Sequence, residues 1–245
     1  MPASSVDRAV LPTEEEKAEV VRRMFGAIAP RYDLLNHLLS LNIDRRWRRR
    51  AVDRLLEGRE PAGLFLDACA GTLDLSVELA DRPGFRGKVI GSDFTFAMLE
   101  RGKHKLSGRS IVLACADALR LPFPDACFDG VTVGFGVRNL ASLDAGFREF
   151  ARVIKPGGRL VVLEFTTPSW QPFRSLYLFY FLRVLPFIGR LISKHSEAYS
   201  YLPASVLEFP EPPELAERLR AAGFEAVRWE TLTAGIAAIH IGTRA

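Results

Sequence analysis

The sequence has few cysteines and no long apolar run. Its 245 residues include three cysteines, Cys69, Cys115 and Cys127, and no two of them form a Cys-x-x-Cys pair. An odd number at this spacing argues against a disulfide framework and against a zinc site, so we expect no metal. The longest stretch without a charged residue, 231–243, has 13 residues, whereas a membrane span needs roughly 18.

The N-terminal segment lacks the features of a targeting signal. Its first 20 residues contain five acidic side chains and no apolar core, which fits neither a signal peptide nor an Arg-rich transit peptide. We therefore expect a cytoplasmic protein, with residues 1–22 flexible. Five arginines, at 45, 46, 48, 49 and 50, surround Trp47. They favour first a solvated helix face and then contact with an anionic membrane, and we expect no nucleic-acid partner.

Apolar runs alternate with helical patterns along the chain, which predicts a single α/β domain over residues 1–245. The runs are mostly continuous rather than alternating, as in strands buried on both faces. We expect a Rossmann-like, doubly wound and mostly parallel sheet of seven strands, whose last strand is antiparallel because residues 233–235 are too short for a crossover. The expected strands are 63–69, 88–94, 110–116, 128–135, 158–165, 226–232 and 236–243, and the expected helices are 74–80, 95–105, 143–154 and 213–222.

The first turn from strand to helix is the place to look for a ligand, since open α/β sheets bind ligands beyond the carboxyl ends of their strands. Small residues at 68–71 allow close approach to the backbone, although Gly71 is the only one of the three fingerprint glycines. An ordinary tight turn also explains this segment. Asp93 ends the second expected strand and suits ribose hydroxyls, while Asp117, after the third, suits the exocyclic amine of adenine.

Two nucleoside cofactors suit such a site, NAD and S-adenosylmethionine. The first turn lacks the full glycine fingerprint of a dinucleotide site, and Asp67 and Asp74 would repel a pyrophosphate but tolerate a sulfonium and an amino group. The residues therefore favour the methyl donor. Arg138 follows the fourth expected strand as an isolated cation, after Gly134 and Gly136.

Several segments resemble the quinone C-methyltransferases, class I S-adenosylmethionine-dependent enzymes that methylate demethylmenaquinol or a polyprenyl benzoquinol. The resemblance runs from about residue 23 to the C-terminus and is most specific in Arg-Val-Ile-Lys-Pro-Gly-Gly-Arg-Leu-Val-Val-Leu-Glu-Phe-Thr at 152–166. Further matching segments are 32–40 with Trp47, 121–125, 135–139, 198–202 and 232–235. The family usually has glycine where Leu73 stands, histidine at Asp44 and serine at Gly134.

The resemblance implies S-adenosylmethionine as the cofactor and a polyprenyl quinol as the substrate. By this resemblance Thr72, Asp93, Asp117 and Ala118 contact the cofactor, with Gly134 through its backbone; we add Asp67 and Gly71 from the first turn. We expect Arg138 to stabilise the phenolate of the acceptor, with Tyr32, Asp33 and His195 as candidate partners.

An aromatic segment at 170–195 is expected to be a helical insertion that covers the substrate or forms a lid. It also suggests peripheral contact with an anionic membrane, because Arg183 and Arg190 stand among apolar neighbours. Three alternatives stay open at this point. They are a methyltransferase for another small acceptor, an NAD-dependent oxidoreductase, and a non-catalytic nucleoside-binding module.

Overall fold

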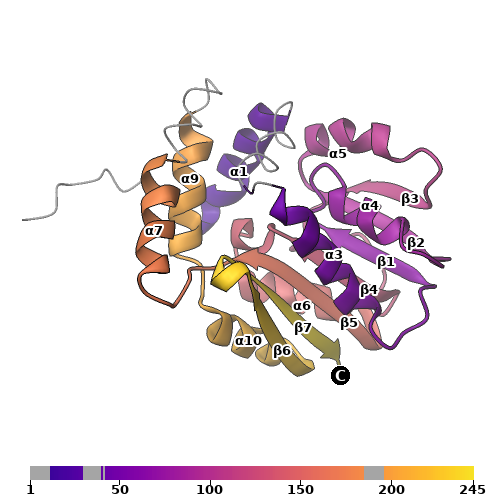
Figure 1. The fold of residues 1–245 in the computed structure, drawn as a ribbon. Coiled ribbons are helices and arrows are strands. Elements are labelled where there is room, and N and C mark those ends of the chain that lie inside the picture. The colour runs from indigo at the N-terminus through magenta and orange to yellow at the C-terminus, as the bar shows by residue number, and fades with distance from the viewer. Residues whose placement is uncertain (1–11, 30–39, 41, 185–195) are drawn as a thin grey trace, which may run out of the picture.

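Seven strands form one sheet, in the order β3-β2-β1-β4-β5-β7-β6 (Figure 1). The structure is a computed structural model that describes residues 12–29, 40, 42–184 and 196–245. The strands are β1 (Leu64–Ala68), β2 (Lys88–Asp93), β3 (Ile111–Cys115), β4 (Phe128–Gly134), β5 (Ile154–Phe165), β6 (Phe224–Leu232) and β7 (Ala237–Arg244). The strand order reverses at β1 and β4, so the carboxyl ends of these two strands form the crevice where such sheets bind ligands.

The expected fold class is confirmed. β1 to β5 pair in parallel, and β7 runs antiparallel to both β5 and β6. The short connection at Thr233–Gly235 is a 3-10 turn, as the predicted hairpin requires.

The start of β5 differs from the prediction. We expected the strand to begin at Gly158, after a helix breaker, but β5 begins at Ile154, which pairs with Phe128. The pairing then jumps from Phe128 to Gly130 on β4 and from Ile154 to Arg159 on β5, so residues 155–158 bulge from the ladder. Lys155 Nζ binds Asp129 Oδ1 at 2.7 Å across this bulge, which lets the strand pair on both sides of a Pro-Gly-Gly segment.

Helices cover both faces of the sheet. Leu160 and Val162 of β5 join a core with α6 and α10, whereas Val161 and Leu163 join a core with α3 and α4, as the two-residue period of a strand requires. The helices near the sheet are α3 (Ile43–Leu56), α4 (Asp74–Ala80), α5 (Phe96–Gly102), α6 (Leu143–Val153) and α10 (Pro212–Ala221).

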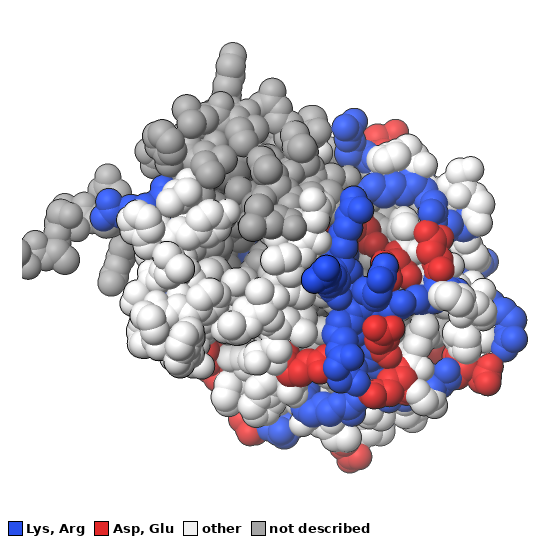
Figure 2. Space-filling view, in the orientation of Figure 1, with Lys and Arg blue, Asp and Glu red and all other residues white. Residues whose placement is uncertain are grey.

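The arginine-rich segment is helix α3, which packs on the sheet through its apolar side. Trp47, Ala51 and Leu55 are buried at helical spacing, and Trp47 Nε1 donates to Thr233 Oγ1 at 2.8 Å. Figure 2 shows the lysines and arginines as a band interrupted by acidic side chains. Arg50 exemplifies the pattern because it pairs with Glu230 at 2.9 Å.

Three further helices stand together beside the sheet: α1 (Glu14–Ile28), α7 (Phe173–Phe179) and α9 (Ser196–Leu207) (Figure 1). Residues 14–22, part of the segment expected to be flexible, belong to α1. A capping box between Thr13 and Glu16 begins this helix. The expected helical insertion corresponds to α7 and a π-helical turn, Tyr180–Val184; its remainder, 185–195, lies outside the described residues. In the described part of the chain, no helix is long and apolar enough to cross a membrane.

His240 makes stability depend on pH. Burial lowers the pKa of His240 to about 4, and its Nε2 lies 2.9 Å from the Pro212 carbonyl, which accepts the hydrogen bond. Below about pH 6.5 the unfolded chain takes up a proton that the folded chain accepts only near pH 4. We therefore expect the stability advantage of the wild type over His240→Gln to shrink by about 2 to 3 kcal/mol between pH 7.5 and pH 4.5.

Urea unfolding of both proteins at several pH values measures this difference. Burial also raises the pKa of Asp67 to about 7, which changes stability with pH in the opposite direction. Because this effect is the same in the wild type and in His240→Gln, the difference between the two proteins isolates the contribution of His240. A pH-independent difference would show that His240 titrates alike in the folded and unfolded chains.

Candidate functional site

A pocket opens at the carboxyl ends of β1, β2, β3 and β4. Of the seven residues expected to hold a cofactor, five line it: Gly71, Asp93, Asp117, Ala118 and Gly134. The other lining residues are Ala18, Val21, Phe25, Cys69, Phe94, Met98, Ala116, Leu119, Phe135, Gly136, Asn139, Leu140 and Ala141. The pocket is therefore mostly apolar, with two carboxylates at the ends of neighbouring strands.

Asp93 fixes two turns at once. Its Oδ2 accepts the N–H of Gly71 at 2.9 Å and its Oδ1 accepts the N–H of Thr95 at 2.8 Å. Burial raises the pKa of Asp93, and these backbone hydrogen bonds oppose the rise. Each carboxylate oxygen keeps a second lone pair, so this side chain can still accept hydrogen bonds from two ribose hydroxyls.

The first turn adopts a strained backbone without the usual glycines. Cys69 and Leu73 have φ of 54° and 72°, and Phe135 at the end of β4 has 58°, values that cost energy for a residue with a Cβ atom. A Cβ atom on Gly136 would lie 2.3 Å from that of Cys69. Glycine at 136 is thus required for the first and fourth strand ends to approach each other.

The side chain of Leu73, which stands where the family has glycine, lies outside the pocket. Its side chain is fully buried and points away from the pocket, toward Gly91 and Gly102. A Cβ atom on Gly91 would lie 2.5 Å from Leu73 Cδ2, and one on Gly102 would lie 2.9 Å from Cδ1. The leucine side chain fills the space that the two glycines leave. This packing stabilises the positive φ of Leu73, which a residue with a branched side chain disfavours.

Asp67 and Thr72, also expected to contact the cofactor, are buried and do not line the pocket. Asp67 lies beneath the turn, where Ser76 Oγ donates to it at 2.6 Å and Thr132 Oγ1 at 3.2 Å. Burial raises the pKa of Asp67 to about 7, against the effect of both hydrogen bonds. Its visible role is to connect β1 with α4 and β4.

Asp117 begins the turn after β3. Its Oδ1 accepts the N–H of Leu119 at 2.9 Å, which is the hydrogen bonding of an Asx turn. The exposed carboxylate and the buried Ala118 both face the pocket, as expected for recognition of a base.

Helix α1 is the part of the pocket that sequence reasoning missed. Ala18, Val21 and Phe25 line the pocket from this helix, and Val21 is buried. The capping box at Thr13 and Glu16, followed by apolar residues at helical spacing, was the available signal.

Arg138 is not the isolated cation that we expected. It is buried and its Nη1 donates to Glu164 Oε1 and to the Phe135 carbonyl, both at 2.6 Å. Its guanidinium lies 5.5 Å from the ring centroid of Phe165. A buried guanidinium needs a counter-ion, and Glu164 at the end of β5 supplies it.

Arg138 nevertheless adjoins the pocket. Asn139, the next residue, lines the pocket and accepts a hydrogen bond from Tyr201 Oη of α9 at 3.2 Å. The candidate partners Tyr32, Asp33 and His195 lie outside the described residues. Among the residues that are described, no three His, Cys, Asp or Glu side chains form a group that could hold a metal ion.

Asp44, where the resemblance leads one to expect histidine, forms an ion pair with Arg48. Arg48 also lies 3.5 Å from Asp74 at the start of α4 and stands over the Phe135 ring at 5.8 Å. Asp44 thus pairs within α3 with the same arginine that joins α3 to the start of α4.

The chain is similar in sequence to known proteins over most of its length. The sequence pattern of the ubiE/COQ5 methyltransferase family matches residues 12–244. The chain is 52% identical over 224 residues to the demethylmenaquinone methyltransferase of Thermus thermophilus, covering 90% of this chain and 100% of that protein. It is 48% identical over 234 residues to the ubiquinone/menaquinone biosynthesis C-methyltransferase UbiE of a Geobacter species, covering 94% and 98%.

Solved structures support the fold. The [4+2]-cyclase SpnF aligns with a TM-score of 0.67 at 18% identity, covering 96% of this chain and 97% of that one. An S-adenosylmethionine-dependent methyltransferase of Thermotoga maritima aligns with a TM-score of 0.62 at 21% identity, covering 91% and 99%.

Two substitutions of Leu73 separate packing from backbone strain. We expect Leu73→Ala to lower the free energy of unfolding by about 3 kcal/mol through the cavity it leaves. Leu73→Gly makes the same cavity but removes the penalty of a positive φ, so it should cost about 1 kcal/mol less than the alanine variant. Urea unfolding measures both. A glycine variant more stable than the wild type would show that strain outweighs packing here.

Proposed function

Because the chain belongs to the ubiE/COQ5 methyltransferase family, we propose that it transfers the methyl group of S-adenosylmethionine to a ring carbon of a polyprenyl quinol in quinone biosynthesis. The quinol is demethylmenaquinol or the equivalent benzoquinol of ubiquinone synthesis. These are the acceptors that the names of its relatives point to.

The charge of the pocket supports the methyl donor over NAD. Asp93 and Asp117 line the pocket, and no lysine or arginine side chain in the described part of the chain does so. A dinucleotide brings an anionic pyrophosphate, which two carboxylates would repel, whereas S-adenosylmethionine brings a sulfonium and an amino group. The residues therefore fit this cofactor.

The residues that line the pocket support a place for each part of the nucleoside. Asp93 suits the ribose hydroxyls, Asp117 and Ala118 suit the base, and Gly71 leaves room for the remainder beside the first turn. The bound cofactor supplies an electrophilic methyl group. The protein itself must hold the acceptor carbon in line with that methyl group.

The acceptor must become nucleophilic at its ring carbon. Loss of the proton from a ring hydroxyl achieves this, and with a pKa near 10 a phenol needs help to ionise. Arg138 is the described candidate, held by Glu164 at 2.6 Å beside the pocket wall at Asn139. Tyr32, Asp33 and His195 stay candidates for the base that accepts a proton.

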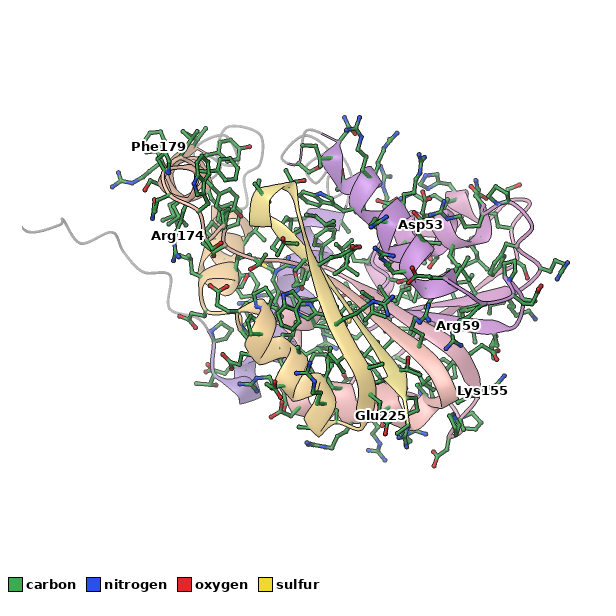
Figure 3. All side chains as sticks on the ribbon, turned by 60° about the horizontal axis from the view of Figure 1, so that its bottom comes forward. Asp53, Arg59, Lys155, Arg174, Phe179 and Glu225 are labelled. Atoms are coloured by element: carbon green, nitrogen blue, oxygen red, sulfur yellow. The ribbon has the colours of Figure 1, made fainter. Side chains whose placement is uncertain are left out.

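We further propose that α7 contacts an anionic membrane on its cytoplasmic side. Trp170, Leu176 and Phe179 expose 66%, 65% and 62% of their surfaces. Figure 3 shows Phe179 and Arg174 on α7, at the end of the molecule away from the sheet. Exposed apolar side chains beside arginines suit a lipid interface, which is where a polyprenyl tail would reside.

The first test combines cofactor binding with turnover. Asp93→Asn keeps the size of the side chain but removes its charge and one acceptor. We expect calorimetry to show S-adenosylmethionine affinity at least about tenfold weaker, and label transfer to reduced demethylmenaquinol to fall with it. Asp125→Asn is the matched control, since Asp125 is exposed and pairs with Arg152 outside the pocket. Unchanged affinity in Asp93→Asn would contradict this placement of the cofactor.

The second test addresses the membrane. The double variant Leu176→Ser with Phe179→Ser should co-sediment at least about tenfold less with phosphatidylglycerol vesicles than the wild type. Val112→Ser is the control, because Val112 is 48% exposed on β3, at the opposite edge of the sheet. Equal binding by the double variant and the wild type would exclude α7 as the contact.

A further inference from the structure

Two buried polar atoms near the end of β5 have no hydrogen-bond partner among the residues that the structure describes. They are Oη of Tyr177, on α7, and Nε of Arg138, in the turn after β4. Nearly all buried polar groups in folded proteins are paired, so each such exception needs an explanation. Burying these two donors without a partner weakens the fold, and a ligand atom would remove that cost.

Both groups border the same ring, that of Phe165. The guanidinium of Arg138 lies 5.5 Å from its centroid, and Tyr177 packs in the cluster that includes Phe165. Burial raises the pKa of Tyr177, and the charge of Arg138 opposes that rise. The Tyr177 hydroxyl therefore stays protonated at neutral pH and can donate.

Arg138 lies just behind the wall of the cofactor pocket, whereas Tyr177 does not line the pocket and packs in the cluster that includes Phe165. Arg138 binds the carbonyl of Phe135, a pocket residue, and precedes Asn139, another. The neighbouring Tyr201 shows the contrast, because its Oη is already bonded to Asn139 at 3.2 Å. Glu164 holds Nη1 of Arg138 at 2.6 Å and so fixes the orientation of the guanidinium without using Nε.

We propose that Tyr177 Oη and Arg138 Nε donate hydrogen bonds to one ring oxygen of the acceptor quinol and so place its ring beside the pocket wall at Asn139. This inference rests on the proposed function. Two donors suit an acceptor oxygen that is ionised or is losing its proton. They disfavour binding of an amine, because its own N–H would point at them. Tyr177 is thus a residue that selects phenolic acceptors and favours their ionised form.

Because both donor atoms are buried, the proposed contact requires α7 to shift so that the acceptor ring can enter. Tyr177 is three residues from the π-helical turn Tyr180–Val184, and such turns interrupt regular helical hydrogen bonding. The side chains beneath α7 are apolar: Phe181, Val206 and Phe165 pack around Tyr177. These apolar side chains suit the faces of a quinol ring, and the two donors suit its oxygen.

The test is Tyr177→Phe, which removes only the hydroxyl, with Tyr180→Phe as the matched control on the next helical segment. Turnover is measured with a short-tailed demethylmenaquinol kept reduced under anaerobic conditions, across pH. We expect kcat/KM about 10- to 100-fold lower, an acid limb of the kcat profile moved to higher pH, and unchanged affinity for S-adenosylmethionine. Tm should stay the same or rise, since an unpaired buried hydroxyl is removed.

A second measurement does not depend on methyl transfer. The ionised form of 2-naphthol has its own absorption band, so titration of bound 2-naphthol shows whether the protein lowers its pKa. We expect wild type and Tyr180→Phe to lower this pKa and Tyr177→Phe to lower it less.

The two measurements separate the two hypotheses. If the wild type methylates the quinol but Tyr177→Phe behaves like it in both measurements, the donor pair is wrong and the proposed function stands. If the wild type does not methylate the quinol but ionises naphthol through Tyr177, the proposed acceptor is wrong and the donor pair stands. A fall in Tm of Tyr177→Phe would show a hydrogen bond within the protein and overturn the inference, as would wild-type failure in both measurements.

Discussion

The carboxylate of Asp93 is the contact on which the cofactor pocket depends. It accepts N–H groups from Gly71 in the turn after β1 and from Thr95 in the turn after β2. Hydrogen bonds to a charged acceptor are stronger than neutral ones, and the Ala70 N–H adds a bond to the Ser92 carbonyl at 2.9 Å. The first turn is therefore shaped by its neighbour strand as much as by its own residues.

This external support explains how the turn does without two of the usual glycines. Residues at positive φ persist when their surroundings over-determine the conformation. Leu73 meets that condition because its side chain fills the space beside Gly91 and Gly102, and Cys69 meets it against Gly136. The glycines needed for close approach thus stand on the neighbouring elements, where a fingerprint search of the turn itself does not look.

Local patterns predicted the sheet and the strand ends, because burial on both faces leaves continuous apolar runs and because carboxyl ends of parallel strands converge. They located Asp93, Asp117, Gly71 and Gly134 in one pocket, to which the family resemblance added Ala118. They failed wherever a contact joins distant residues. Glu164 was part of the segment read as a strand, yet nothing in that segment shows that it faces Arg138, 26 positions earlier. Likewise, Lys155 pairs with Asp129 across a bulge that carries β5 through a helix breaker.

The two halves of the site differ in how their polar groups are satisfied, and this difference bears on specificity. The cofactor half rests on strand ends whose carboxylates and backbone groups bond to one another within the sheet. The proposed acceptor half depends on α7 and α9, and there Arg138 Nε and Tyr177 Oη lack partners among the described residues while Glu164 balances the charge of Arg138. Unpaired buried donors discriminate strongly between ligands, because a ligand without a matching hydrogen-bond acceptor leaves these donors unsatisfied. On the proposed placement, cofactor choice is a property of the sheet and acceptor choice a property of the helices added to it, so that the same sheet can serve different acceptors when those helices change.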